Sequence, residues 1–229
     1  FIGFLSGSYP AFYMTKFRPA EVLKGKIRSG FKRSGFRNGL VVFQFAISTI
    51  LLICTVLVYQ QIEFLQNKNL GFERENIVVI SNGNRLGNKI ITYKNALVQH
   101  SDVINAAVST IVPPGVNNNS PFRGTDGTDH LMGFYGADYE HLQTLGIKIK
   151  EGRNFSRDIS SDSSAILINE AAARVLGWKN PIGEEITQGA TDYKLKVIGV
   201  MENFNFETLK DEIRPLIIRL ETTGSRMAV

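Results

Sequence analysis

The chain has 229 residues, 43% of them apolar and 21% charged, which is enough for one or two domains with a sizeable core. Its net charge of +5 is unevenly placed, because residues 1–37 hold eight basic residues against one acid while the remainder holds 18 basic and 20 acidic residues. This distribution argues against a surface that binds a nucleic acid backbone. Cys54 is the single cysteine, which excludes an intrachain disulfide and a thiolate metal site.

The N-terminal region predicts a membrane protein. Residues 1–13 are expected to be the end of a preceding transmembrane helix, since Gly3 and Gly7 have the spacing of small residues at helix contacts in membranes. No signal peptide is recognised, so the chain is expected to start within a longer protein. Residues 14–37 are predicted to be a cytoplasmic, basic interfacial segment followed by a flexible linker at residues 25–35.

Residues 38–61 are predicted to form a transmembrane helix. The 21 residues of Gly39–Tyr59 carry no charge, and at about 1.5 Å per residue they span roughly 30 Å, the thickness of a hydrocarbon core. Its few polar side chains, such as Thr55, are expected to face neighbouring helices. The basic block precedes the helix, so the positive-inside rule places the N-terminal side in the cytoplasm and the long C-terminal part outside it.

Residues 62–229 are predicted to be a polar helical stalk and an incomplete exported core domain of the α+β class, with a sandwich-like arrangement. The stalk covers Gln60–Asn67 and is expected to stop near Gly71. Patterns of apolar residues predict strands at Ile77–Ile80 (buried), Ile104–Ile111, Ile147–Lys150, Ala165–Ile168, Tyr193–Met201 and Leu216–Leu220. Helices are predicted at Lys89–His100, at Tyr139–Leu145 with Asp138 as N-cap, and at Glu170–Leu176 with Asn169 as N-cap and Gly177 at the end.

A segment rich in Pro, Gly and Asn, Pro113–His130, predicts a long loop that is either functional or disordered. Phe122 and Arg123 in its middle are candidate contacts for a partner, although an incidental aromatic residue in a mobile loop is the stronger alternative. Asp126, Asp129 and His130 invite comparison with a metal site. Their spacing matches no standard metal-binding loop, so we expect none.

No catalytic motif is present in the sequence. The nearest approach to a phosphate-binding loop, Gly30–Gly35, continues with Phe36 and Arg37 where Lys and a hydroxyl residue are required. The three histidines lie in unrelated contexts, and neither a Gly-x-Ser-x-Gly nor a His-Glu-x-x-His motif occurs. We therefore predict no catalytic, cofactor-binding or metal-ligating residue and expect the chain not to be an enzyme.

Several short motifs resemble those of MacB/FtsX-type ABC transporter permeases, and their order agrees along nearly the whole chain. The N-terminal ones resemble the end of a last membrane helix and the first helix of a second permease repeat, as in the duplicated eight-helix members. They are Gly7–Ala11, Phe17–Lys24 and Gly39–Phe45. Others resemble the stalk exit and the MacB-like periplasmic core domain. These are Leu70–Phe72, Asp138–Tyr139, Leu145–Ile147, Glu151–Phe155, Ile168–Ala172, Asn180–Gly183 and Val197–Val200.

This resemblance implies a multi-pass permease subunit in the bacterial inner membrane, whose C-terminal domain is periplasmic or extracellular. The partners that it implies are a cytoplasmic ABC ATPase, a second permease or repeat in a dimer-like assembly, a periplasmic adaptor and the lipid bilayer. The ATPase would drive movement of the exported domain to export or extract a cargo that these residues do not select. The resemblance also implies three further helices of the repeat beyond Val229.

Two other classes of protein remain open from the sequence. A membrane sensor or receptor also joins a membrane span to an exported ligand-binding domain, but it would carry a cytoplasmic output domain after a second span. A membrane-anchored periplasmic enzyme would need buried carboxylates and a histidine that converge in one pocket.

Overall fold

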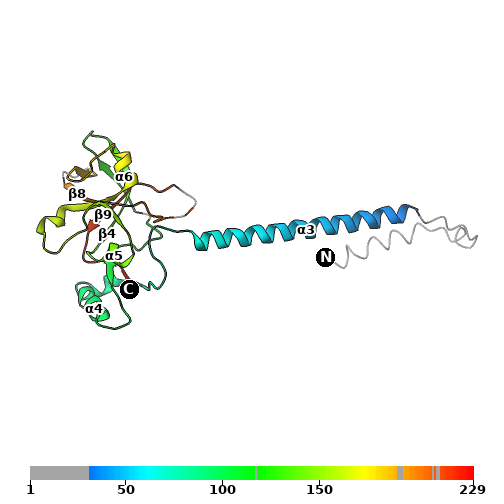
Figure 1. Ribbon diagram of the computed structural model, residues 1–229, viewed down its shortest axis with the longest axis horizontal. Helices are drawn as coiled ribbons and strands as arrows, with labels where there is room; N and C mark the ends of the chain where they lie inside the picture. The colour runs from blue at the N-terminus through cyan, green and yellow to red at the C-terminus, as the bar shows by residue number, and fades with distance from the viewer. Residues whose placement is uncertain (1–30, 117, 190–192, 208, 210–211) are drawn as a thin grey trace, which may run out of the picture. The chain divides into compact units, whose positions relative to one another are not determined.

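The computed structural model describes residues 31–116, 118–189, 193–207, 209 and 212–229 (Figure 1). The chain divides into two compact units, Phe1–Gln66 and Asn67–Val229. The expected membrane-helix end at residues 1–13 and most of the expected segment at 14–37 lie outside the described residues.

Helix α3 runs without interruption from Phe31 to Asn67. It is long and apolar enough to cross a membrane, with a mean hydropathy of 2.5 in its most apolar window. The flexible linker predicted at residues 25–35 is wrong for residues 31–35, because they already belong to the helix. The hydroxyl of Thr55 donates to the carbonyl of Leu51 at 2.8 Å, so it is satisfied within its own helix and needs no neighbouring helix.

The second unit contains short helices and a mixed sheet of ten strands. The strands are β1 (Val79–Ser81), β2 (Ala107–Ser109), β3 (Asn119–Arg123), β4 (Asp129–Ala137), β5 (Ile149–Gly152), β6 (Ala165–Asn169), β7 (Glu185–Gln188), β8 (Lys194–Met201), β9 (Leu216–Leu220) and β10 (Arg226–Ala228). The helices are α4 (Lys89–Val98), α5 (His141–Thr144) and α6 (Glu170–Val175), with 3-10 turns η1 (Gly83–Leu86) and η2 (Ser160–Ser164).

Six of these strands form a closed ring. Strand β4 pairs with β3, β3 with β7, β7 with β8, β8 with β6, and β6 with β9. The ring closes because β9 returns in parallel to β4, with Gly133 opposite Leu216 and Ala137 opposite Leu220. The predicted sandwich is therefore wrong in its arrangement, although the α+β class is confirmed. Closure leaves the ring without free edges.

Alternation of side chains along the ring strands produces two cores. Each ring strand contributes to an inner cluster, through Phe122, Met132, Ile186, Val197, Ile168 and Ile217. The residues that point the other way, such as Tyr135, Leu167 and Ile218, belong to a second cluster outside the ring. Because β6 buries both of its faces, it has the continuous apolar sequence Ala-Ile-Leu-Ile that predicted this strand.

A smaller sheet of β1, β10 and β2 carries helix α4 and joins the ring through β4. One residue pair, Ser109 opposite Ala137, forms the ladder between β2 and β4. A third apolar cluster lies here, with Ile90 and Leu97 of α4 against Val108 and Met227. The small sheet and α4 thus have a minor core of their own.

The structure corrects two of the predicted strands in this region. The strand at Ile77–Ile80 was expected to be buried, yet Val78 and Val79 are 64% and 45% exposed because β1 pairs only with β10 among the described residues. The strand at Ile104–Ile111 is reduced to β2, and Ile104 is 98% exposed. By contrast, the helix capped by Asn169 is confirmed, since the Asn169 side chain accepts a hydrogen bond from the amide of Ala172.

Most of the loop predicted at Pro113–His130, from Asn119 onward, is in fact the beginning of a β-hairpin. Strand β3 pairs with β4 from Asn119 opposite Gly133 to Arg123 opposite Asp129. The predicted contact residue Phe122 is 1% exposed and meets Phe134 edge-to-face inside the ring, with ring centroids 6.0 Å apart. Phe122 is therefore a core residue of a paired strand rather than a contact residue in a loop.

We expect Phe122→Ala to lower the free energy of unfolding by about 3–5 kcal/mol, because it removes a fully buried aromatic side chain from the ring. The matched change Leu131→Ala lies in the same hairpin, where Leu131 is 64% exposed, and it should cost less than about 1 kcal/mol. Thermal unfolding in detergent, followed by circular dichroism, measures both. Equal losses would contradict the placement of Phe122 in the core.

Candidate functional site: the Lys94 ionic cluster and the exit segment

The exit segment, Leu70–Glu73, follows helix α3 in the chain and is fixed to the core of the second unit. The carbonyl of Leu70 accepts a hydrogen bond from the amide of Asn205 at 2.7 Å, and the amide of Glu73 donates to the carbonyl of Leu145 at 2.8 Å. Phe72 is buried edge-to-face against Phe204, with ring centroids 6.3 Å apart. These contacts make the exit segment part of the folded domain rather than a loose tether.

Gly71 allows this close attachment. Its φ of +80° favours glycine, and a Cβ atom at this position would lie 2.9 Å from the Cα of Phe204. The expected stop near Gly71 is thus a tight turn that comes after the helix has ended at Asn67.

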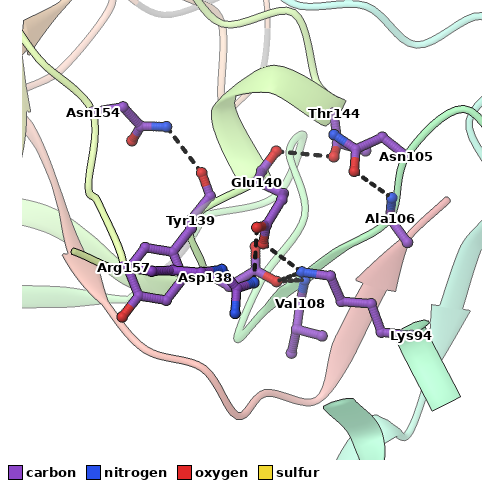
Figure 2. A network of polar contacts seen from close by, with 10 residues as sticks. All are labelled: Lys94, Asn105, Ala106, Val108, Asp138, Tyr139, Glu140, Thr144, Asn154 and Arg157. Atoms are coloured by element: carbon purple, nitrogen blue, oxygen red, sulfur yellow. Dashed lines mark hydrogen bonds and ion pairs between the residues drawn. The ribbon is translucent and has the colours of Figure 1, made fainter. Parts of the chain in front are cut away.

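Lys94 of α4 is at the centre of a partly buried ionic cluster (Figure 2). Its Nζ atom is 2.5 Å from Oδ2 of Asp138 and 2.6 Å from Oε2 of Glu140. The side chains of Lys94 and Asp138 are 7% and 4% exposed. The other carboxylate oxygen of Glu140 accepts from Arg157 at 2.8 Å. We call these four residues the Lys94 cluster; it contains two basic and two acidic groups.

Asp138 connects this cluster to the small sheet. Its amide donates to the carbonyl of Val108 at 2.9 Å, and its Oδ2 accepts from the amide of Val108 at 2.8 Å. Asp138 was predicted to cap a helix over Tyr139–Leu145. That prediction is wrong, because the carboxylate is used by Lys94 and Val108, and helix α5 has Glu140 at its N-cap without a side-chain cap bond.

The electrostatics differ between the two carboxylates. Burial raises the pKa of Asp138 above its ordinary value, although the hydrogen bond and charge of Lys94 oppose the shift. Burial also acts to raise the pKa of Glu140, but hydrogen bonds from Lys94 and Arg157 outweigh it and the pKa is lowered. The Arg157 guanidinium lies 4.8 Å from the centre of the Tyr139 ring, a cation–π contact that holds it over the cluster.

A small cavity lies beside the cluster, and its lining includes Ile91 and Asn95 of α4, Asp138, Arg157 and Thr222. The cavity has a volume of about 20 Å³, which is room for a single water molecule. It is far too small for a transported or reacting molecule. The cavity beside the cluster is therefore not a substrate pocket.

His141 and Tyr135 form a second buried polar contact, next in sequence to the cluster. The Tyr135 hydroxyl lies 3.0 Å from Nε2 of His141, and both side chains are fully buried. Burial lowers the pKa of His141 to about 3 and raises that of Tyr135. The imidazole is therefore neutral in the folded protein over the physiological range.

The residues singled out from the sequence do not form a site. Asp129 pairs with Arg123 at 2.8 Å, and Asp126 accepts from the amide of Thr128 within the hairpin turn. Over the described residues, no group of three His, Cys, Asp or Glu side chains could hold a metal ion.

The Lys94 cluster was missed in the sequence, although one signal was present. Lys94 stands four residues after Ile90 and three before Leu97, on the side of the helix where both apolar residues are directed toward the core. A basic residue on an apolar helix face implies a buried partner. The partner itself lies 44 residues away in sequence, so no local pattern indicates which acid it is.

Comparison of the sequence with known protein families identifies the family of this chain. The model of the MacB-like periplasmic core domain matches residues 40–227, which include most of the apolar part of α3 as well as the second unit. The chain belongs to this family. The domain is found in ABC transporter permeases, so the predicted resemblance is confirmed at this level. The sequence matches no curated protein.

Solved structures that resemble this MacB-like chain share little sequence with it. The periplasmic region of MacB from Actinobacillus actinomycetemcomitans has 16% identity and a TM-score of 0.49, and the match covers 69% of this chain and 75% of that one. The extracellular domain of the noncanonic ABC-type transporter YknZ from Gram-positive bacteria has 18% identity and a TM-score of 0.44, covering 59% and 68% respectively.

We expect Lys94→Met to lower the free energy of unfolding of this MacB-like domain by about 3–5 kcal/mol, because it leaves two carboxylates in the cluster without their shared cation. The same change at Lys194, whose 3.4 Å pair with Glu185 is exposed, should cost less than about 1 kcal/mol. Urea unfolding of the two variants compares them directly. A loss at Lys94 no larger than that at Lys194 would show that the cluster contributes no stability.

His141 should make the protein less stable in mild acid. Its pKa is about 3 in the folded state against 6.5 ordinarily, so its stabilising contribution is complete above pH 6.5 and is lost as the pH falls from 6.5 toward 3. The titration of His141 alone can change the free energy of unfolding by at most about 1.4 kcal/mol per pH unit. Unfolding free energies measured between pH 7 and 4 test this expectation.

The variant for this pH series is Tyr135→Phe/His141→Phe, which removes both buried polar groups together. It should show a shallower loss of stability on acidification than the unchanged protein. His100→Phe, which alters an exposed histidine, should leave the slope as it is. Parallel pH profiles for all three proteins would rule out His141 as the cause.

Proposed function

We propose that this chain is part of a permease subunit that couples ATP hydrolysis by a separate cytoplasmic ATPase to movement of its exported domain. The observation that carries the proposal is the family match, which runs from the apolar part of α3 through the second unit as one pattern. We infer from the basic N-terminal block that residues 14–37 face the cytoplasm and the second unit faces the periplasm or the exterior.

The length of α3 supports a mechanical role for it. Its 37 residues extend over about 55 Å at 1.5 Å per residue, whereas a hydrocarbon core is about 30 Å thick. The excess is divided between the two ends, so about two helical turns, Gln60–Asn67, remain as a stalk on the exported side. The exit segment that follows it is hydrogen-bonded to the core of the exported domain, so a shift of the helix end would be delivered to folded structure.

We further propose a multi-pass protein of the bacterial inner membrane that works with a second permease or repeat and with a periplasmic adaptor, and that performs no chemical step itself. Hydrolysis would take place in the partner ATPase. Nucleotide would act by favouring one of two conformations, through a difference in the contacts that each conformation makes. This movement would export a cargo or extract it from the membrane.

The test is copurification of the tagged protein, expressed at its native level and extracted from its membrane with detergent. We expect a cytoplasmic ATPase with a Walker A motif to copurify, and the ATPase activity of the complex to be lost when the P-loop lysine of that partner is changed. An unrelated multi-pass protein with the same tag is the control. Recovery of a histidine kinase, or of no ATPase at all, would favour a membrane sensor instead.

A further inference from the structure

The residues from Asp138 to Leu145 form a short, rigid connection between the exit segment and helix α4. At one end, Leu145 accepts the hydrogen bond of the Glu73 amide at 2.8 Å. At the other end, Asp138 and Glu140 hold the Lys94 ammonium at 2.5 and 2.6 Å. Two segments far apart in sequence therefore contact the two ends of one eight-residue stretch.

This connecting stretch is well braced internally. The amide and the hydroxyl of Thr144 both donate to the carbonyl of Glu140, at 2.8 and 2.9 Å, and the amide of Leu145 donates to the carbonyl of His141 at 3.1 Å. The side chains of His141 and Leu142 are buried. A displacement at Leu145 would therefore move the whole stretch rather than bend it.

Helix α4 packs on a small core and on the small sheet. Its apolar residues Ile90 and Leu97 lie in the smallest of the three clusters. The sheet below it joins the ring through the ladder pair of Ser109 and Ala137 and through hydrogen bonds of Val108 and of Thr110, just after β2, to Asp138 and Gly136. In the described part of the chain, Lys94 supplies the ion pairs of α4. Buried opposite charges in a low-dielectric surrounding resist separation strongly, so the Lys94 cluster ties α4 to the connecting stretch.

We propose that residues Asp138–Leu145 carry a displacement of the exit segment to helix α4, and that Lys94 is the positioning residue that couples α4 to this movement. The proposal rests on the proposed function, because it assumes a nucleotide-dependent shift of α3. It makes α4, with its exposed residues Ile91, Tyr93 and Val98, the part of the domain whose position reports the state of the ATPase. The coupling runs through direct contacts at the two ends of this stretch, with Glu73 at Leu145 and with Lys94 at Asp138, so it can be tested directly.

The experiment is hydrogen exchange on the intact complex with its ATPase, in nucleotide-free and ATP-bound states, for the unchanged protein and for Lys94→Met. In the unchanged protein, we expect nucleotide to alter exchange both at residues 70–73 and across α4. In Lys94→Met, the change at residues 70–73 should persist while the nucleotide-dependent difference across α4 is lost. Lys94→Arg should restore it.

Two further variants separate coupling from stability. Lys94→Met/Asp138→Asn removes the ion pair without leaving Asp138 as an unpaired buried charge, and it should lose the α4 response as completely as the single variant. Arg153→Met breaks another ion pair with a buried carboxylate, that of Asp162, which is 1% exposed. Neither residue belongs to the exit segment, to Asp138–Leu145 or to α4. It should keep the response of α4.

Three outcomes would overturn the proposal: an unchanged α4 response in both Lys94→Met variants, its loss in Arg153→Met, or no α4 response to nucleotide in the unchanged protein. Each of them leaves the permease function intact if the ATPase copurifies. Failure of the ATPase to copurify would instead overturn the proposed function, and it is judged separately. The two failures are therefore distinguishable.

Discussion

The parallel pairing of β9 with β4 is the constraint on which the rest of the exported domain depends. It closes the six-stranded ring, so that each ring strand has a partner on both sides. Closure also sets which side chains point inward, because alternation along a strand then has one enclosed side. The outward residues Tyr135 of β4 and Ile218 of β9 build the second core, in which Phe72 of the exit segment is buried. Attachment of the exit segment is thus a consequence of ring closure.

Local sequence was sufficient where an element depends on its own residues. Strand β9 was predicted with its observed bounds, and the helix after Asn169 was recognised from its cap. Prediction failed where the structure of a segment depends on a partner that is distant in the sequence. The polar, Pro-containing sequence of β3 resembles a loop, but its backbone is satisfied by β4 and by β7, more than 60 residues further on. Asp138 has the sequence position of a helix cap, but in the folded domain its carboxylate accepts a hydrogen bond from Lys94. In neither case does the local sequence indicate which distant residue is the partner.

The family resemblance succeeded for a different physical reason. Several of its motifs contain a glycine that the backbone requires, since Gly146, Gly152 and Gly183 have φ values of +64°, +78° and +94°. A Cβ atom at Gly152 would also lie 2.3 Å from the carbonyl oxygen of Ile198. Such positions tolerate little else. The order of the turn glycines can therefore be recognised in the sequence. The side chains that meet at Lys94 come from α4, from the residues just before α5 and from the turn that holds Arg157, so no single sequence motif contains them.

Among the residues that the structure describes, β1 has no partner strand on the side away from β10, and this edge matters when the domain is handled without its membrane helix. Val78 exchanges both backbone hydrogen bonds with Val229, so in an antiparallel ladder the amide and carbonyl of Val79 face away from β10. No charged residue lies between Ile77 and Ser81, and Val78 and Val79 are exposed. An uncharged, apolar edge of this kind is a template for strand addition and aggregation. A water-soluble version of the domain would therefore need that edge covered or charged, and a lysine in place of Val79 would do so without removing any bond of the β1–β10 ladder.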